Sequence, residues 1–188
     1  NLGLGVTPSA WSTGKGFEVG FAGSGVYSYS QTDTELLSNA YYNAGYKYGG
    51  TGRAMMYGMG TAGTGIHAWF TAASGTAGNA ITFTQAMSLL SDGNLVIGRT
   101  SDSFSTVGMT LRANGTISAT ANGNEVIDLN RLTSDGGIQR FFRSGTQVGS
   151  ISVTTSATTY NTSSDYRLKN ITGPITNSGA YIDSLNPV

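Results

Sequence analysis

The sequence contains no cysteine among its 188 residues, and only one histidine, His67. Without cysteine there is neither a disulfide framework nor a thiolate metal site, and one histidine cannot build a multi-histidine zinc site. We therefore expect no metal and no cofactor. Proline is also scarce, with three residues, and the 28 glycines follow no Gly-x-y period. This excludes a collagen triple helix.

Charge is equally sparse. Charged residues make up 11% of the chain, against roughly a quarter in an ordinary soluble domain, and ten basic side chains cancel ten acidic ones. Nucleic acids and anionic membranes select basic surfaces, so we expect no nucleic-acid partner. No run of about 18 apolar residues is present, so we expect no membrane insertion. Because the chain begins with Asn1 rather than Met, we expect it to be a piece of a longer polypeptide.

What the chain does contain points to β-structure. Hydrophobic residues reach 38% and include ten tyrosines, which is too much apolar surface for a disordered linker. The phrase Leu2-Gly3-Leu4-Gly5 has a close counterpart at Leu95-Val96-Ile97-Gly98. An Asp92-Gly93 pair before this second copy predicts a hairpin with a tight turn, and Asn114-Gly115 predicts a second hairpin 22 residues later. By analogy, Asn1–Thr7 is predicted to be the second strand of a hairpin.

Several further elements follow from apolar alternation and turn residues. Strands are predicted at Ile138–Arg143 and Gln147–Val153, with large side chains on both faces of the first. Other predictions are a strand–turn–strand unit at 41–48, a helical turn within 32–40, and short strands at 126–129 and 158–162. A sheet that is apolar on both faces would be insoluble alone. We therefore expect that a single chain forms no hydrophobic core by itself and that three copies intertwine.

The octet Ser163-Ser164-Asp165-Tyr166-Arg167-Leu168-Lys169-Asn170 has the form of a helix start. Ser164 suits the N-cap, and Asp165 lies at the positive end of the helix dipole. The pattern from Ser164 to Ile171, after the β-type run Thr158–Thr162, also resembles the entrance to the endosialidase-type intramolecular chaperone of phage tail spikes and tail fibres. The alternative is an ordinary capped helix with a solvated Lys169.

The resemblance implies a self-cleaving junction. Ser164 and Lys169 would be the catalytic pair, and the bond between Ser163 and Ser164 would be cut once three chains have intertwined. A lysine acts as a general base only when desolvation lowers its pKa. Chaperones of this family are several times longer than the segment from Ser164 to Val188, so the walls that would desolvate Lys169 are missing. We expect the cut in the full-length chain only.

The fold class we predict is all-β: an elongated, intertwined homotrimeric fibre of β-hairpin repeats, with a β-prism-like stalk and a short helical start at the C-terminal end. Three segments are expected. These are a receptor-binding head at 1–100, stalk hairpins at 101–163, and the start of the chaperone at 164–188.

The function that this resemblance implies is that of the distal segment of a tail fibre, a structural adhesin that attaches the virion to a bacterial surface polysaccharide or lipopolysaccharide. It would be made in the host cytoplasm and act in the extracellular phage tail. Flat aromatic rings suit sugars, so the glycan-binding candidates are Tyr42, Tyr46, Tyr48 and Trp69. The alternative for these rings is that they fill the trimer core.

Two other functions compete. A tail-spike glycan depolymerase would need two carboxyl groups across a sugar linkage. Glu18, Glu35 and Glu125 are widely scattered, so its active site would have to form between chains. A bacterial trimeric adhesin would share the fold and differ by a membrane anchor. We expect no activity on an external substrate.

Overall fold

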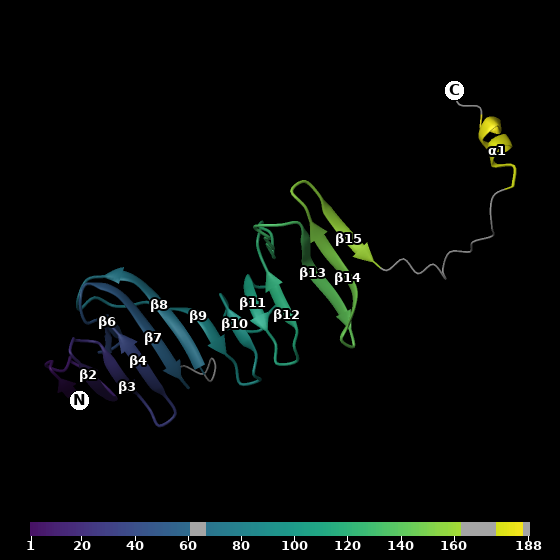
Figure 1. Ribbon diagram of the computed structural model, residues 1–188. Coiled ribbons are helices and arrows are strands. Elements are labelled where there is room, and N and C mark those ends of the chain that lie inside the picture. Colours follow the sequence, from purple (N-terminus) through teal and green to yellow (C-terminus); the bar gives the residue numbers. More distant parts are fainter. Residues whose placement is uncertain (61–66, 163–175, 186–188) are drawn as a thin grey trace. The chain divides into compact units, whose positions relative to one another are not determined.

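The computed structural model describes residues 1–60, 67–162 and 176–185, which form two units, Asn1–Val126 and Ile127–Val188 (Figure 1). Among the residues that the structure describes, the protein is mostly β-structure, as the sequence predicts, with one short helix. The first unit is built on a ten-stranded sheet and the second on a three-stranded sheet.

The ten-stranded sheet is a meander in which nearly every strand pairs with the next one along the chain. Its order is β1-β2-β3-β4-β7-β8-β9-β10-β11-β12. Pairing is antiparallel throughout, except that β1 lies parallel to β2 at one edge. The strands are β1 (Leu2–Leu4), β2 (Lys15–Val19), β3 (Gly25–Ser28), β4 (Thr34–Ser38), β7 (Gly52–Met59), β8 (His67–Gly75), β9 (Thr84–Leu89), β10 (Leu95–Ile97), β11 (Gly108–Leu111) and β12 (Ile117–Thr120).

The predicted hairpins are confirmed. β9 and β10 pair across the Asp92-Gly93 turn, and β11 and β12 pair across Asn114-Gly115. Gly93 and Gly115 have φ of 82° and 87°, which is the left-handed backbone that glycine adopts without strain. The chain at 41–48 is also a hairpin, with strands β5 (Ala40–Tyr42) and β6 (Tyr46–Tyr48), and it forms a separate two-stranded sheet.

Two predictions are wrong. Residues 34–38 form strand β4 rather than a helical turn, because pairing with β3 and β7 outweighs weak local helix preference. The chain at 126–129 forms no strand, and its apolar side chains are exposed. Strand β1 was predicted to be the second strand of a hairpin. In the structure it pairs in parallel with β2, and the first strand of that hairpin stays a prediction.

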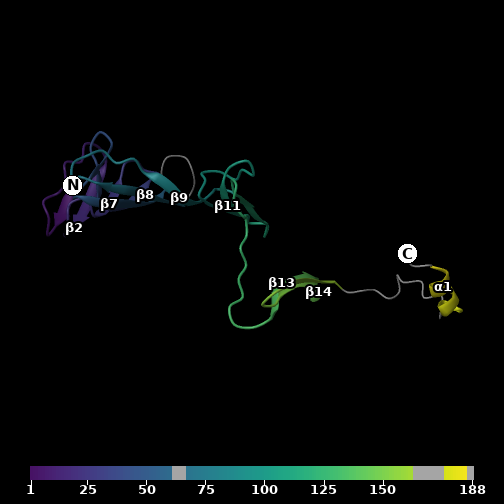
Figure 2. The same ribbon diagram turned by 90° about the horizontal axis from the view of Figure 1, so that it is seen from above.

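One face of the ten-stranded sheet, here called the inner face, is covered. Successive partners across the strands run Gly16–Tyr27–Glu35–Gly58–Ala68–Ser88–Val96–Thr110–Ser118, and every member of this row is buried. Seen from above in Figure 2, the loops of this unit gather on one side of the strands. The row mixes polar and apolar residues, so burial on this face depends on hydrogen bonds as well as on apolar contact.

The hairpin β5–β6 covers part of the inner face. Its Ala40 and Tyr48 join a buried core with residues of the sheet, and half-buried Trp11, Tyr42, Tyr46, Phe70, Ile81 and Phe83 pack around them. The sheet contributes Tyr27, Leu37, Ala54, Met56 and Ala72. We expected that a single chain would not form a hydrophobic core by itself. This expectation is wrong for Asn1–Val126.

The second unit is different. Strands β13 (Gly136–Arg143), β14 (Thr146–Val153) and β15 (Thr158–Thr162) form an antiparallel sheet in sequence order, and helix α1 (Ser178–Ser184) follows. The two predicted strands and the run 158–162 are thus confirmed. No described residue between 127 and 185 is buried. This unit has no interior of its own among the residues that the structure describes.

Candidate functional site

Several aromatic side chains of the first unit pack against one another on the inner face. Tyr27 of β3 lies between Trp11 and Tyr42, with ring centroids 4.6 Å and 5.9 Å away and interplanar angles of 26° and 12°. Tyr42 in turn meets the ring of Tyr46 edge-on, at 5.3 Å. Stacked and edge-on pairs are the favoured arrangements of aromatic rings. Two predicted glycan-binding residues, Tyr42 and Tyr46, thus belong to the packing of a single chain.

The hydroxyl of Tyr46 reaches a carboxylate beneath it. Glu35 is 1% exposed, and its two oxygens lie 2.5 Å and 2.6 Å from the Tyr46 hydroxyl. Burial raises the pKa of Glu35 to about 7, although the hydrogen bond from Tyr46 acts in the opposite sense. Burial also raises the pKa of Tyr46, so this hydroxyl stays protonated and remains a donor. The pair joins half-buried Tyr46 of the hairpin to buried Glu35 of the sheet.

Tyr48 anchors the covering loop. Its ring is buried, and its hydroxyl donates to the carbonyl of Ala73 on β8 at 2.5 Å. Backbone bonds from Tyr48 to Asn79 and from Gly78 back to Tyr48 hold the loop after β8 against β6. A Cβ added at Gly75 would lie 2.2 Å from the Tyr48 ring, so glycine is required for this close approach. The position of Tyr48 is explained by packing.

Trp69, the fourth predicted residue, lies on the opposite face of the sheet. It is 36% exposed, and its ring is tilted against that of Tyr57 at 5.0 Å. The Tyr57 hydroxyl is 2.5 Å from Nδ1 of His67. The structure therefore separates Trp69 from the three tyrosines. Glycan binding by any of the four stays a prediction.

The face that carries Trp69, here called the outer face, has an apolar row that runs from one edge of the sheet to the other. Directly paired residues form the row Leu2–Phe17–Val26–Leu36–Tyr57–Trp69–Met87–Ile97–Met109–Ala119, one from each of the ten strands. No member of this row is charged. Sequence reasoning missed this row, although apolar residues at alternate positions of each strand were the available signal.

Two shallow depressions lie on the outer face. One is bordered by Leu36, Met55, Tyr57 and Trp69, and its lining is almost entirely apolar. The other is bordered by Ile97, Val107, Met109 and Val126. Neither offers the convergent polar groups that orient a small hydrophilic ligand.

A buried arginine fastens the loop after β10 to the inner face. Arg99 is 4% exposed, and Nε and Nη2 both donate to the Thr110 hydroxyl. Nη1 donates to the carbonyls of Ser103 and Thr106, at 2.5 Å and 3.0 Å, and Nη2 also approaches the carbonyl of Ser118 at 3.4 Å. All five guanidinium hydrogens are thereby engaged. Arg99 is a structural clamp with no donor left for a ligand.

The three glutamates have separate surroundings within the single chain. Glu18 is fully buried and accepts from the Ser9 amide and hydroxyl and from the Gly23 amide. Glu35 is occupied by Tyr46, and Glu125 is exposed on a loop. Within the described residues there is also no group of three His, Asp or Glu side chains that could hold a metal ion.

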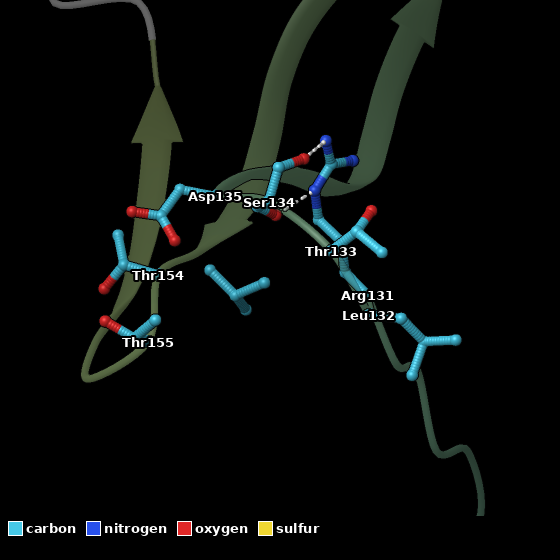
Figure 3. A pocket seen from close by; sticks show the side chains of 8 residues that line it. Arg131, Leu132, Thr133, Ser134, Asp135, Thr154 and Thr155 are labelled. Atoms are coloured by element: carbon cyan, nitrogen blue, oxygen red, sulfur yellow. Dashed lines mark hydrogen bonds between the residues drawn. The ribbon is translucent and has the colours of Figure 1, made fainter.

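The second unit carries a small open pocket beside the start of β13 (Figure 3). Arg131 donates there to the carbonyl and hydroxyl of Ser134, at 2.6 Å and 2.9 Å, and to the carbonyl of Gly137 at 3.2 Å. Asp135 and Thr154 border the same pocket. These bonds shape the turn before β13.

The predicted junction residues Ser163, Ser164 and Lys169 lie outside the described residues, so the cleavage hypothesis stays a prediction. No described helix is long and apolar enough to cross a membrane.

Comparison with known proteins yields little. No family model matches the chain, and no curated protein matches it. A solved structure that it resembles is described as "Geobacillus virus E2 - ORF18"; the identity is 16%, the TM-score is 0.34, and the match covers 59% of this chain. The chain spans about a quarter of that phage protein, 27% of its length. A likeness this slight carries no argument about function.

Proposed function

We propose that this chain is the distal segment of a bacteriophage tail fibre, a homotrimeric adhesin of the virion that attaches to a bacterial surface polysaccharide or lipopolysaccharide. The segment from Ser164 onward would begin a self-cleaving trimerisation chaperone in the longer polypeptide. The resemblance of the octet 163–170 to that chaperone motivates the assignment.

The observation that carries the proposal is the missing interior of the second unit. Phe141, Phe142, Val148 and Tyr160 are 44%, 53%, 48% and 75% exposed in a sheet of only three strands. Small sheets need an apolar face packed against something to be stable in water. Two further copies of the same sheet would supply that packing and would cover its open edges.

Oligomeric mass tests this part of the proposal. Light scattering coupled to size-exclusion chromatography should give about 58 kDa, three times the chain mass of 19.4 kDa. A monomer that persists at micromolar concentration, with a cooperative unfolding transition in the second unit, would contradict it.

Attachment needs a separate test. On the inner-face side, Tyr29 is 58% exposed and its ring lies 5.9 Å from that of Tyr42. We propose that a glycan contacts this exposed Tyr29 ring beside the predicted residue Tyr42. Tyr29→Ala should weaken binding to polysaccharide or lipopolysaccharide of a responsive host at least tenfold. Tyr181→Ala, at an exposed tyrosine of helix α1, is the matched control and should bind normally.

A further inference from the structure

The outer face of the ten-stranded sheet exposes more apolar surface than a monomer ordinarily carries. Twelve large apolar side chains on it are between 36% and 68% exposed: Leu2, Leu4, Phe17, Val19, Val26, Leu36, Met55, Trp69, Ile97, Met109, Leu111 and Ile117. Their exposed fractions add up to between five and six complete residues. With about 160 Å² assumed for each residue, near the lower end of what an aromatic side chain buries, this is on the order of 900 Å².

This exposed apolar area can be compared with the largest apolar patch of a typical monomer and with the area of a stable protein interface. The largest apolar patch on a typical monomer is about 300–600 Å². A stable protein interface takes about 800 Å² from each partner. The outer face therefore has the size of a full interface, and its row from Leu2 to Ala119 is joined without a break by direct cross-strand pairing.

The chemistry of the face points to its occupant. The row from Leu2 to Ala119 has no charge, and the neighbouring row across β7–β12 is Met59–His67–Leu89–Leu95–Leu111–Ile117, with no carboxylate or lysine. A partner must offer a similarly extended apolar surface. A second copy of the chain carries such a surface, and the net charge of zero places no electrostatic penalty on joining copies.

We infer that the outer face is the surface by which copies of this chain pack together within Asn1–Val126. This rests on the homotrimer proposed above and adds the surface through which it forms. Trp69, predicted as a glycan-binding residue, would then lie in the contact between copies. Glycan binding would be left to the inner-face side, where Tyr29 and Tyr42 lie.

The test places a charge in the middle of the row. Leu36→Asp on β4 and Ile97→Asp on β10 replace side chains that are 48% and 39% exposed and contribute nothing to the buried inner row, so each chain should still fold. The expected result is a threefold fall in mass by light scattering. Phe21→Asp and Phe104→Asp are matched controls, because these side chains are 80% and 71% exposed and lie outside the sheet strands; both should keep the wild-type mass.

A second measurement does not depend on a disruptive variant. Because the natural chain has no cysteine, Ile97→Cys and Phe104→Cys each introduce a single thiol. In the assembled protein, a maleimide should label Cys at 97 at least tenfold more slowly than at 104, and the two rates should become equal in denaturant.

The outcomes separate the two proposals. If the wild-type protein is a trimer, the Leu36→Asp and Ile97→Asp variants are trimers too, and the thiol at position 97 is labelled fast, the assignment of this face is overturned. The homotrimer proposal is then unaffected. A wild-type monomer overturns the trimer, and the face assignment with it. If only Leu36→Asp and Ile97→Asp convert the trimer to monomers, and the trimer slows labelling at position 97, both the homotrimer and the outer-face contact are supported.

Discussion

The Tyr46 hydroxyl lies within hydrogen-bonding distance of both oxygens of Glu35, at 2.5 Å and 2.6 Å, beneath the hairpin β5–β6. Glu35 lies on β4, which pairs with β7 in the main sheet, and Tyr46 lies on β6, which pairs with β5 in the covering hairpin. This contact connects the cover of the inner face to the sheet, and two predictions follow from its protonation and its geometry.

The first prediction concerns pH. Burial raises the Glu35 pKa from 4.5 to about 7, so the folded state holds a proton there that the unfolded chain has released. The free energy of unfolding of the first unit should therefore be highest below pH 4.5 and should fall as pH rises towards and through 7, by about 3 kcal/mol in all. Thermal unfolding between pH 5 and 8 should show a decrease of about 10 °C.

The matching variant is Glu35→Gln, which keeps the acceptor for Tyr46 and removes the titration. In this variant the melting temperature of the first unit should change little between pH 5 and pH 8. Glu125→Gln, at an exposed position, should leave the wild-type slope unchanged. A wild-type melting temperature that rises between pH 5 and 8 would contradict the assignment to Glu35.

The second prediction isolates the hydroxyl. Tyr46→Phe keeps the ring contacts with Tyr42 and Phe83 but leaves the buried carboxylate without its donor. The free energy of unfolding at pH 8 should fall by about 1–3 kcal/mol. Because the bond from Tyr46 lowers the Glu35 pKa, its loss should raise that pKa further and steepen the pH dependence. Equal destabilisation at pH 5 and pH 8 would show that the ring, rather than the hydrogen bond, had been disturbed.

The third prediction concerns the Arg99 clamp. Arg99→Lys retains the charge but cannot serve the hydroxyl of Thr110 and the carbonyls of Ser103 and Thr106 together. The first unit should lose about 2–4 kcal/mol of unfolding free energy, and amide hydrogen exchange across 100–107 should accelerate. Arg112→Lys is the control: Arg112 pairs with Asp102 near the surface, so this variant should cost far less.

The fourth prediction concerns the junction. A longer polypeptide that continues past Val188 with a complete chaperone segment should yield a product whose N-terminal residue is Ser164, detectable by intact mass and N-terminal sequencing. Ser164→Ala and Lys169→Met should each abolish this cut while leaving the trimer mass of the uncut chain intact. Cleavage that persists in Ser164→Ala would refute the Ser-Lys assignment.

The local elements could be predicted from short stretches of sequence. Asp92-Gly93 and Asn114-Gly115 demand a left-handed backbone, and the flanking alternation then determines two hairpins without help from distant residues. The strands at 138–143 and 147–153 and the tyrosine hairpin at 41–48 were predictable for the same reason. Strand β4 was not, because Thr34–Ser38 becomes extended through its partners Val26 and Met56, which lie in other segments of the chain.

Composition and local turn chemistry by themselves determined that this protein is a chain of β-hairpins with few charges and no metal-binding cysteines. Only the tertiary structure decided which side of the sheet is covered. Alternation assigns Leu36 and Leu37 to opposite faces but does not say which face receives the β5–β6 hairpin. Burial of Leu37 and exposure of Leu36 follow from the return of residues 40–48 over one side of the sheet. That choice depends on contacts between distant segments, which no short stretch of sequence encodes.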